Sequence, residues 1–143
     1  KASDGIIRNT AFNGHFVFNT LAGKEFSLSK NSTLVFDVKL TWAGGKRYTP
    51  IDVEASENSN EAFGTEYKEE LAWSLQFPAY FKSDVKIGFR KDGRKVSQLW
   101  EFYVENVTNH KNPITQLYSK SKHKIETIYQ IGFFPLFNYR IYF

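Results

Sequence analysis

Gln130-Ile-Gly-Phe-Phe-Pro-Leu-Phe-Asn-Tyr-Arg-Ile-Tyr-Phe143 alternates between two kinds of side chain. Every second residue back from Phe143 is apolar and mostly aromatic, whereas the positions between them include Arg140, Asn138 and Gln130. A period of two over this length is typical of a β-strand whose two faces meet different surroundings. A row of outward aromatic residues on the last strand favours an outer-membrane β-barrel, and the last strand of a soluble β-sandwich is the alternative.

The composition agrees with a strand-based membrane protein. Aromatic residues make up 17% of 143 residues, which is more than a core of this size needs, so we expect many of them to be displayed. No apolar run approaches the ~20 residues of a spanning helix. In a membrane-spanning strand, lipid-facing residues alternate with polar ones, so an average of hydropathy does not detect it. The absence of cysteine excludes disulfides, thiolate metal sites and a cysteine nucleophile. Because the sequence begins at Lys1 without Met or an apolar signal segment, we expect a processed product or a part of a longer protein.

Five segments carry the alternating pattern, and turn residues separate them. The pattern predicts strands over residues 8–22, 34–43, 81–90, 95–107 and 130–143. Short turns are expected at Lys30-Asn31-Ser32 and at Lys91-Asp92-Gly93-Arg94, where Asp-Gly accepts positive φ. Long loops are expected over the acidic segment up to Glu70 and from Thr108 to about Lys124.

This order of turns and loops predicts a topology. Short turns on one side and long loops on the other are typical of an antiparallel up-and-down transmembrane β-barrel with a periplasmic carboxy terminus. Bacterial barrels start at about eight strands, and an open edge in hydrocarbon leaves unpaired backbone groups that cost several kcal/mol each. We therefore expect these strands to be the carboxy-terminal fraction of a larger barrel, with the earlier strands outside this sequence.

Several short segments resemble, in order, the end of TonB-dependent outer-membrane receptors of the Bacteroidota type. The segments are Phe18 to Lys24, Gly44-Gly-Lys-Arg-Tyr-Thr-Pro-Ile-Asp52, Gln76-Phe-Pro-Ala-Tyr-Phe-Lys-Ser-Asp84, Asn106-Val-Thr-Asn109, Gln130-Ile-Gly and the terminal Tyr139-Arg-Ile-Tyr-Phe143. The resemblance implies a 22-stranded barrel with an amino-terminal plug, of which this chain supplies about the last five strands.

The resemblance also implies a function and partners. The function would be energy-coupled import of a nutrient ligand, with siderophore, cobalamin, glycan and peptide classes all open. The implied partners are the plug and earlier strands of the same receptor, TonB with ExbB and ExbD, the barrel assembly machinery acting on the last strand, and outer-membrane lipid with lipopolysaccharide.

The alternation assigns side chains to three surroundings. The positions expected to face the lumen or plug are Asp37, Lys39, Lys82, Asp84, Lys86, Arg90, Glu101, Glu105 and Arg140. The positions expected to face lipid or an aromatic girdle are Phe36, Val38, Trp42, Trp73, Val85, Ile87, Phe89, Trp100, Phe102, Val104, Phe137, Tyr139, Ile141 and Phe143. The positions expected in external loops are Asp52, Glu54, Glu57, Glu61, Glu66, Lys120, Lys122 and Lys124.

Other chemistry has weaker support in the sequence. The acidic loop lacks the spacing of a calcium loop and is more simply a solvated segment, and the three histidines have no ligand spacing. The basic run after Ser119 can meet lipopolysaccharide phosphates or lie in a soluble loop. Glu69 and Glu70 would point to opposite faces of a strand, so they do not form a glycosidase pair.

We therefore predict no catalytic residue, no metal and no cofactor, and hence no enzyme. The net charge is +4, but the basic residues are scattered, so nucleic acid is not expected. The competing hypothesis is a soluble β-sandwich or small-barrel module that binds sugar or lipid, and detergent dependence would separate the two.

Overall fold

The computed structural model describes residues 5–60 and 64–143 and divides into two compact units. The sheet unit comprises residues 18–42, 81–110 and 131–143. The loop unit comprises the described residues of 1–17, 43–80 and 111–130.

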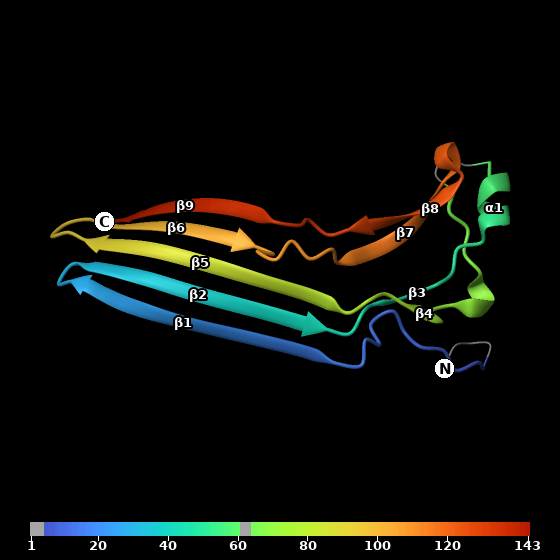
Figure 1. Cartoon of the computed structure of the whole chain (residues 1–143), viewed down its shortest axis with the longest axis horizontal. Coiled ribbons are helices and arrows are strands. Elements are labelled where there is room, and N and C mark those ends of the chain that lie inside the picture. Colours follow the sequence, from blue (N-terminus) through green and yellow to red (C-terminus); the bar gives the residue numbers. More distant parts are fainter. Residues whose placement is uncertain (1–4, 61–63) are drawn as a thin grey trace. The chain divides into compact units, whose positions relative to one another are not determined.

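The sheet unit is a single five-stranded sheet (Figure 1). The spatial order is β1-β2-β5-β6-β9, so strands that follow one another in this unit are neighbours. This confirms the predicted all-β, antiparallel fold, but the sheet is open and no closed barrel forms among the described residues, since β1 and β9 are edge strands. The bounds are β1 (Val17–Ser29), β2 (Ser32–Ala43), β5 (Tyr80–Asp92), β6 (Ser97–Glu105) and β9 (Phe134–Tyr142).

The predicted first strand is misplaced. It was expected over residues 8–22, but β1 begins at Val17 and continues to Ser29. The backbone turns before it, because the Asn13 amide donates to the Thr10 carbonyl at 3.1 Å and His15 has a φ of 73°. Period-two spacing in residues 12–16 therefore accompanies a folded loop, and the alternation itself cannot reveal the turn.

The registers place the two kinds of side chain on opposite faces of the sheet. Residues paired across antiparallel strands point to the same face. The pairs Ile87↔Phe102 and Phe102↔Phe137 therefore carry one apolar row across β5, β6 and β9. The neighbouring pairs Gly88↔Glu101 and Glu101↔Asn138 carry a polar row on the other face.

The loop unit contains short elements that the sequence did not reveal. The long loop predicted from Thr108 to about Lys124 is wrong, because β7 and β8 form an antiparallel hairpin in which Tyr118 is paired with Ile125. The turn between them is possible because His123 adopts a left-handed φ of 48°. The elements are β3 (Arg47–Tyr48), which pairs with β4 (Leu75–Gln76), α1 (Val53–Asn58), η1 (Glu69–Leu71), β7 (Pro113–Ser119), η2 (Lys120–Lys122) and β8 (Lys124–Tyr129).

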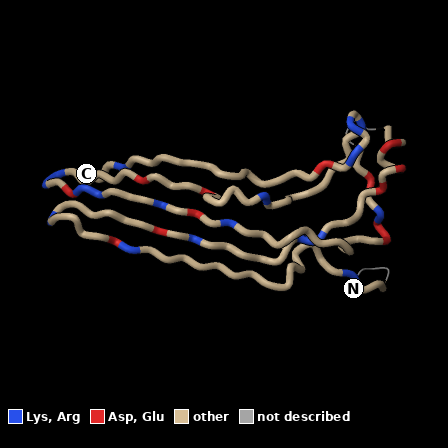
Figure 2. The backbone as a smooth tube through the Cα atoms, in the orientation of Figure 1, with Lys and Arg blue, Asp and Glu red and all other residues tan. Residues whose placement is uncertain are grey.

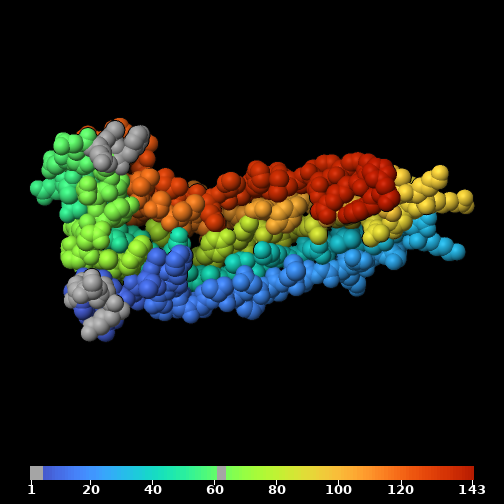
Figure 3. Space-filling model, turned by 180° about the vertical axis from the view of Figure 1, so that it is seen from behind, coloured from blue at the N-terminus to red at the C-terminus, as the bar shows by residue number. Residues whose placement is uncertain are grey.

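The sheet unit has almost no core of its own. Among its described residues, Val104, at 8% exposure, is the only buried apolar side chain. On the face seen in Figure 3, the strands from β1 (blue) to β9 (red) lie side by side without another segment of the unit over them. The buried apolar residues of the loop unit are Ile51, Phe77 and Tyr118. A single sheet layer cannot bury either face, so this unit needs a partner layer or an apolar solvent.

Candidate functional site

The polar face of the sheet carries charged residues along its strands, and Figure 2 shows blue and red positions following one another along them. At mid-sheet, Lys86 Nζ lies 2.6 Å from Asp37 Oδ2 and 3.6 Å from Glu101 Oε1. Arg140 Nη2 lies 2.9 Å from the other oxygen of Glu101. Asn138 donates to that same oxygen at 3.0 Å. Four strands, β2, β5, β6 and β9, therefore contribute to one ion-pair network, and opposite charges alternate across it.

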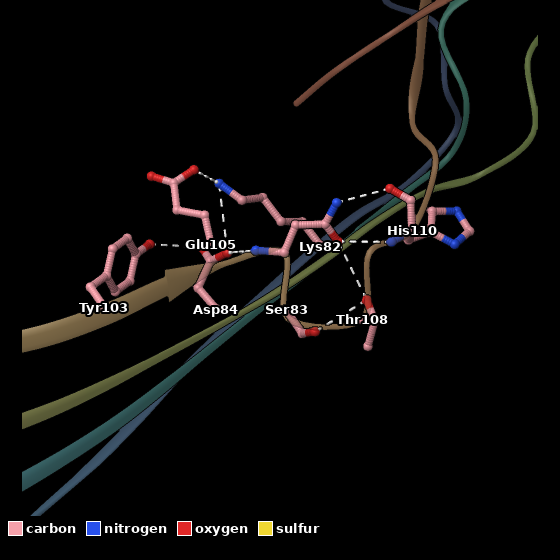
Figure 4. A network of polar contacts seen from close by, with 8 residues as sticks. Lys82, Ser83, Asp84, Tyr103, Glu105, Thr108 and His110 are labelled. Atoms are coloured by element: carbon pink, nitrogen blue, oxygen red, sulfur yellow. Dashed lines mark hydrogen bonds and ion pairs between the residues drawn. The ribbon is translucent and has the colours of Figure 1, made fainter. Parts of the chain in front are cut away.

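A second network lies where β5 begins and β6 ends (Figure 4). Asp84 is 3% exposed, and its carboxylate accepts the Asn106 backbone N–H at 2.9 Å and the Tyr103 hydroxyl at 3.0 Å. Lys82 Nζ lies 3.6 Å from Asp84 and 2.6 Å from Glu105. A buried carboxylate is stable only when it is paired and hydrogen-bonded, and these donors meet that requirement.

The turn after β6 depends on Asn106. This residue is 1% exposed and has a φ of 49°, a left-handed conformation that Asn tolerates better than most residues. Its side-chain amide donates to the His110 carbonyl at 2.9 Å and accepts the His110 N–H at 3.0 Å. The Val107 N–H donates to the Ser83 carbonyl at 2.8 Å. The network thus fixes the point at which the chain leaves the sheet.

These networks stabilise the sheet and position its strands. Each carboxylate already accepts hydrogen bonds or ion pairs, and no group of three or more His, Cys, Asp or Glu side chains that could hold a metal occurs in the described part of the chain. The charged groups on this face can hydrogen-bond water or polar groups of another segment.

The apolar face carries large exposed side chains. Ile87, Phe102 and Phe137, which adjoin one another in the register, are 45%, 48% and 68% exposed. Toward the hairpin end, the Trp100 ring stacks between Phe89 at 5.7 Å and Tyr139 at 5.5 Å, as measured between ring centroids. Aromatic ladders and aliphatic side chains of this size bury much apolar area when covered.

The structure brings together most of the charged positions selected from the sequence. Lys39 lies two residues from Asp37 on β2 and is exposed, and Arg90 pairs with Asp92 at 2.9 Å. The seven that join the two networks described above are Asp37, Lys82, Asp84, Lys86, Glu101, Glu105 and Arg140.

The positions assigned to lipid or a girdle do not all lie on the sheet. Trp73 belongs to the loop unit, in a turn after η1 with a φ of 59°, and Phe143 follows the end of β9 and is 99% exposed. The positions that lie on strands of the sheet are Phe36, Val38, Trp42, Val85, Ile87, Phe89, Trp100, Phe102, Val104, Phe137, Tyr139 and Ile141.

The acidic segment is partly folded. Asp52 caps α1, because its carboxylate accepts the Ala55 N–H at 3.0 Å. The Glu66 N–H donates to the buried Ser56 hydroxyl at 2.9 Å. Glu54 is exposed in the first turn of α1, and Glu61 lies outside the described residues.

The basic run lies against the acidic segment within the loop unit. Glu57 accepts a hydrogen bond from the Tyr118 hydroxyl at 2.5 Å and lies 3.0 Å from His123 Nδ1. The Tyr118 hydrogen bond, followed by the charge and hydrogen bond of His123, lowers the pKa of Glu57 below its ordinary value. Lys120 donates to the Ser59 carbonyl. Lys122 pairs with Glu126 at 2.7 Å, and Lys124 lies 4.0 Å from the same carboxylate.

Sequence reasoning missed two residues that organise these regions. The turn at Asn106 could have been predicted, because an Asn directly after a strand often adopts the left-handed conformation of a turn. The role of Tyr118 could not have been predicted, because its hydrogen-bond partner Glu57 is 61 positions away in the sequence.

The chain matches no protein-family model, no curated protein and no solved structure. Within the described residues, no helix has both the length and the apolar character needed to span a membrane.

Proposed function

We propose that this chain forms carboxy-terminal strands of an outer-membrane β-barrel in a TonB-dependent receptor that imports a nutrient ligand. The observation that carries the proposal is the contrast between the two faces of one uncovered sheet. One face holds interlinked ion pairs, and the other exposes the row of Ile87, Phe102 and Phe137.

Strand length supports a membrane-spanning role. A transmembrane β-strand needs about 9–11 residues. The strands of the sheet have 13, 12, 13, 9 and 9 residues, so each can cross the hydrocarbon region. In this setting the apolar face lies against lipid, and the charged face lines a wet lumen where it can hydrogen-bond a plug.

The two edge strands support a larger assembly. β1 and β9 have neighbours on one side only, so each presents a row of unpaired N–H and C=O groups. Such groups are not tolerated in hydrocarbon, so further strands must pair with both edges to close a barrel. The assignment to an importer driven by TonB, ExbB and ExbD rests on the sequence resemblance, and the transported ligand stays open among the four classes given above.

Cell fractionation tests the proposal. In cells that produce the chain from its native gene, we expect it in the outer-membrane fraction, resistant to carbonate washing and released only by detergent. We further expect that the same gene encodes a plug and the strands that pair with β1 and β9. A monomer that stays in solution without detergent would contradict the proposal and support the soluble binding module.

A further inference from the structure

The loop unit forms a half-open cavity that none of the roles above uses. Its volume is about 620 Å³, within the range of roughly 300–1,000 Å³ typical of small-molecule sites. The three parts of the loop unit all contribute walls, with Phe12 and Phe16 from the first, Phe77 from the second and Pro113 from the third.

Close backbone contacts hold the walls of the cavity in place. A Cβ atom on Gly44 would come within 1.5 Å of the Gly14 carbonyl oxygen, and one on Gly45 within 1.9 Å of the Phe77 carbonyl oxygen. The Gly44 N–H donates to the Phe16 carbonyl at 3.0 Å, and the Phe77 N–H donates to the Lys46 carbonyl at 3.0 Å. Glycines allow these segments to meet, so the cavity is formed before any ligand binds.

The cavity has apolar walls, and part of their surface is exposed to water. Phe77 is 7% exposed and stacks on Tyr48 with ring centroids 4.2 Å apart, so this wall is rigid. Phe12 and Phe16 are 84% and 44% exposed. A ligand with an apolar or aromatic body would remove their surfaces from water, which is favourable at roughly 25 cal/mol per Å².

The charge of the cavity is positive. Lys46 lines it, with Nζ 5.7 Å from the centre of the Phe12 ring, and no Asp or Glu belongs to the lining among the described residues. The adjacent Arg47 guanidinium contacts three groups: His15 Nε2 at 3.2 Å, the Asn13 carbonyl at 3.2 Å and the Ser74 carbonyl at 3.5 Å. Because Arg47 can only donate, His15 Nε2 accepts this hydrogen bond. Arg47 does not line the cavity, but it contacts the lining residues Asn13 and His15, and it has no ion pair with a carboxylate of the described residues.

We propose that this cavity binds a small organic anion, with its apolar or aromatic body among Phe12, Phe16 and Phe77 and its carboxylate or phosphate group on Lys46. Two cationic side chains beside apolar walls select for a ligand that combines both properties, because a charge-assisted hydrogen bond is stronger than a neutral one. The inference goes beyond the import proposal, and it rests on the loop unit alone.

Titration calorimetry with a matched pair of probes tests the inference. The probes are 2-naphthoate and the uncharged 2-naphthamide, which share one aromatic body. The protein is the full product of the native gene, held in nanodiscs of zwitterionic lipid, or in plain buffer if fractionation shows it to be soluble. Failure of the import proposal therefore leaves this test intact. We expect naphthoate to bind about tenfold more tightly than naphthamide, a difference of about 1.4 kcal/mol.

Three variants identify the group responsible for this preference. Lys46→Met should abolish it while naphthamide binding remains, and Lys46→Arg should retain it. Lys30→Met, which removes the same charge at the β1–β2 turn in the sheet unit, should leave both affinities unchanged. Equal binding of the two probes, no binding of either, or a preference that survives in Lys46→Met would overturn the proposal.

A final arm separates two sources of such an anion. The naphthoate titration is repeated in nanodiscs that contain an anionic phospholipid. Loss of naphthoate binding there would support the site and assign it to a lipid headgroup, whereas retained binding would support the site and assign it to a soluble anion.

Discussion

The two units of this chain contrast in what specifies their structure. In the sheet unit, position along a strand decides the face that a side chain occupies, and the core is almost absent, with Val104 alone buried among the apolar residues described there. In the loop unit, contacts between distant residues decide the structure, as in the Tyr118–Glu57 hydrogen bond and the approach of Gly44 to Gly14. The contrast indicates that the sheet unit depends on its surroundings, whereas the loop unit holds itself together. Four sets of substitutions test this contrast between the units.

The largest effect is expected on the apolar face of β9. Phe137 and Leu136 are neighbours that point to opposite faces, and both are exposed, at 68% and 40%. Phe137→Lys should cost about 2–4 kcal/mol of folding free energy in the membrane, because it places a cation in hydrocarbon. Leu136→Lys should cost much less, because the proposal places its face in a wet lumen. Guanidinium unfolding in lipid bilayers measures both, and equal small costs for the pair would contradict the lipid assignment.

The next effect is expected in the loop unit, where Gly44→Ala places a Cβ against the Gly14 backbone. Backbone cannot turn away as a side chain can, so we expect a loss of about 3 kcal/mol, the upper end for overpacking. The matched control in the sheet unit is Gly88→Ala, whose added Cβ would meet Val35 at an ordinary 3.5 Å. Unfolding free energies measure both variants, and a tolerated Gly44→Ala would show that the loop unit does not depend on this contact.

A smaller effect is expected at the network of Figure 4. Asp84→Ala removes the acceptor of the Asn106 N–H and the Tyr103 hydroxyl, and we expect a cost of about 2 kcal/mol from the unsatisfied donors. Asp92→Ala removes a carboxylate that is 40% exposed and pairs with Arg90, and it should cost at most about 1 kcal/mol. The midpoint of denaturant unfolding compares the two, and equal shifts would mean that burial of Asp84 contributes nothing.

The smallest effect is expected from acidification of the loop unit. The pKa of Glu57 is lowered in the folded state, so its contribution to stability is present above the ordinary carboxyl pKa of about 4.3 and is lost as the pH falls through the lower folded value. Amide-exchange protection factors of β7 and β8, followed from pH 7 to pH 3, measure this loss. Glu57→Gln should reduce the pH dependence and Glu54→Gln should not, and identical profiles for the two variants would exclude a role for the Glu57 contact.

Sequence reasoning succeeded where the physical cause is local and periodic. The alternation of Ile87 with Lys86 and of Phe102 with Glu101 is visible in the sequence because a strand places successive side chains on opposite faces. The ion pair between Lys86 and Asp37 was not predictable as a pair, because it depends on the register between β5 and β2.

Other features could not be predicted because their causes are distant in the sequence. The sequence predicts a loop where β7 and β8 form a hairpin. The hairpin turn depends on His123 in a left-handed conformation, and the sequence has no Gly there to indicate such a turn. The start of β1 was misplaced because the contact between Gly14 and Gly44 joins residues 30 positions apart. The buried state of Asp84 likewise follows from Asn106, 22 positions further along the chain.

Cysteine labelling along β9 determines which face of the sheet meets lipid and which meets water. These 143 residues contain no cysteine, so Leu136→Cys, Phe137→Cys, Asn138→Cys and Tyr139→Cys each introduce one thiol into them, and any cysteine elsewhere in the gene product is first replaced by Ser. All four positions are exposed in the structure, and a water-soluble maleimide would label every one of them on a soluble protein. In intact outer membranes we predict labelling at residues 136 and 138, and labelling at residues 137 and 139 only after the membrane is dissolved and the protein unfolded. Equal labelling of all four in intact membranes would contradict the account.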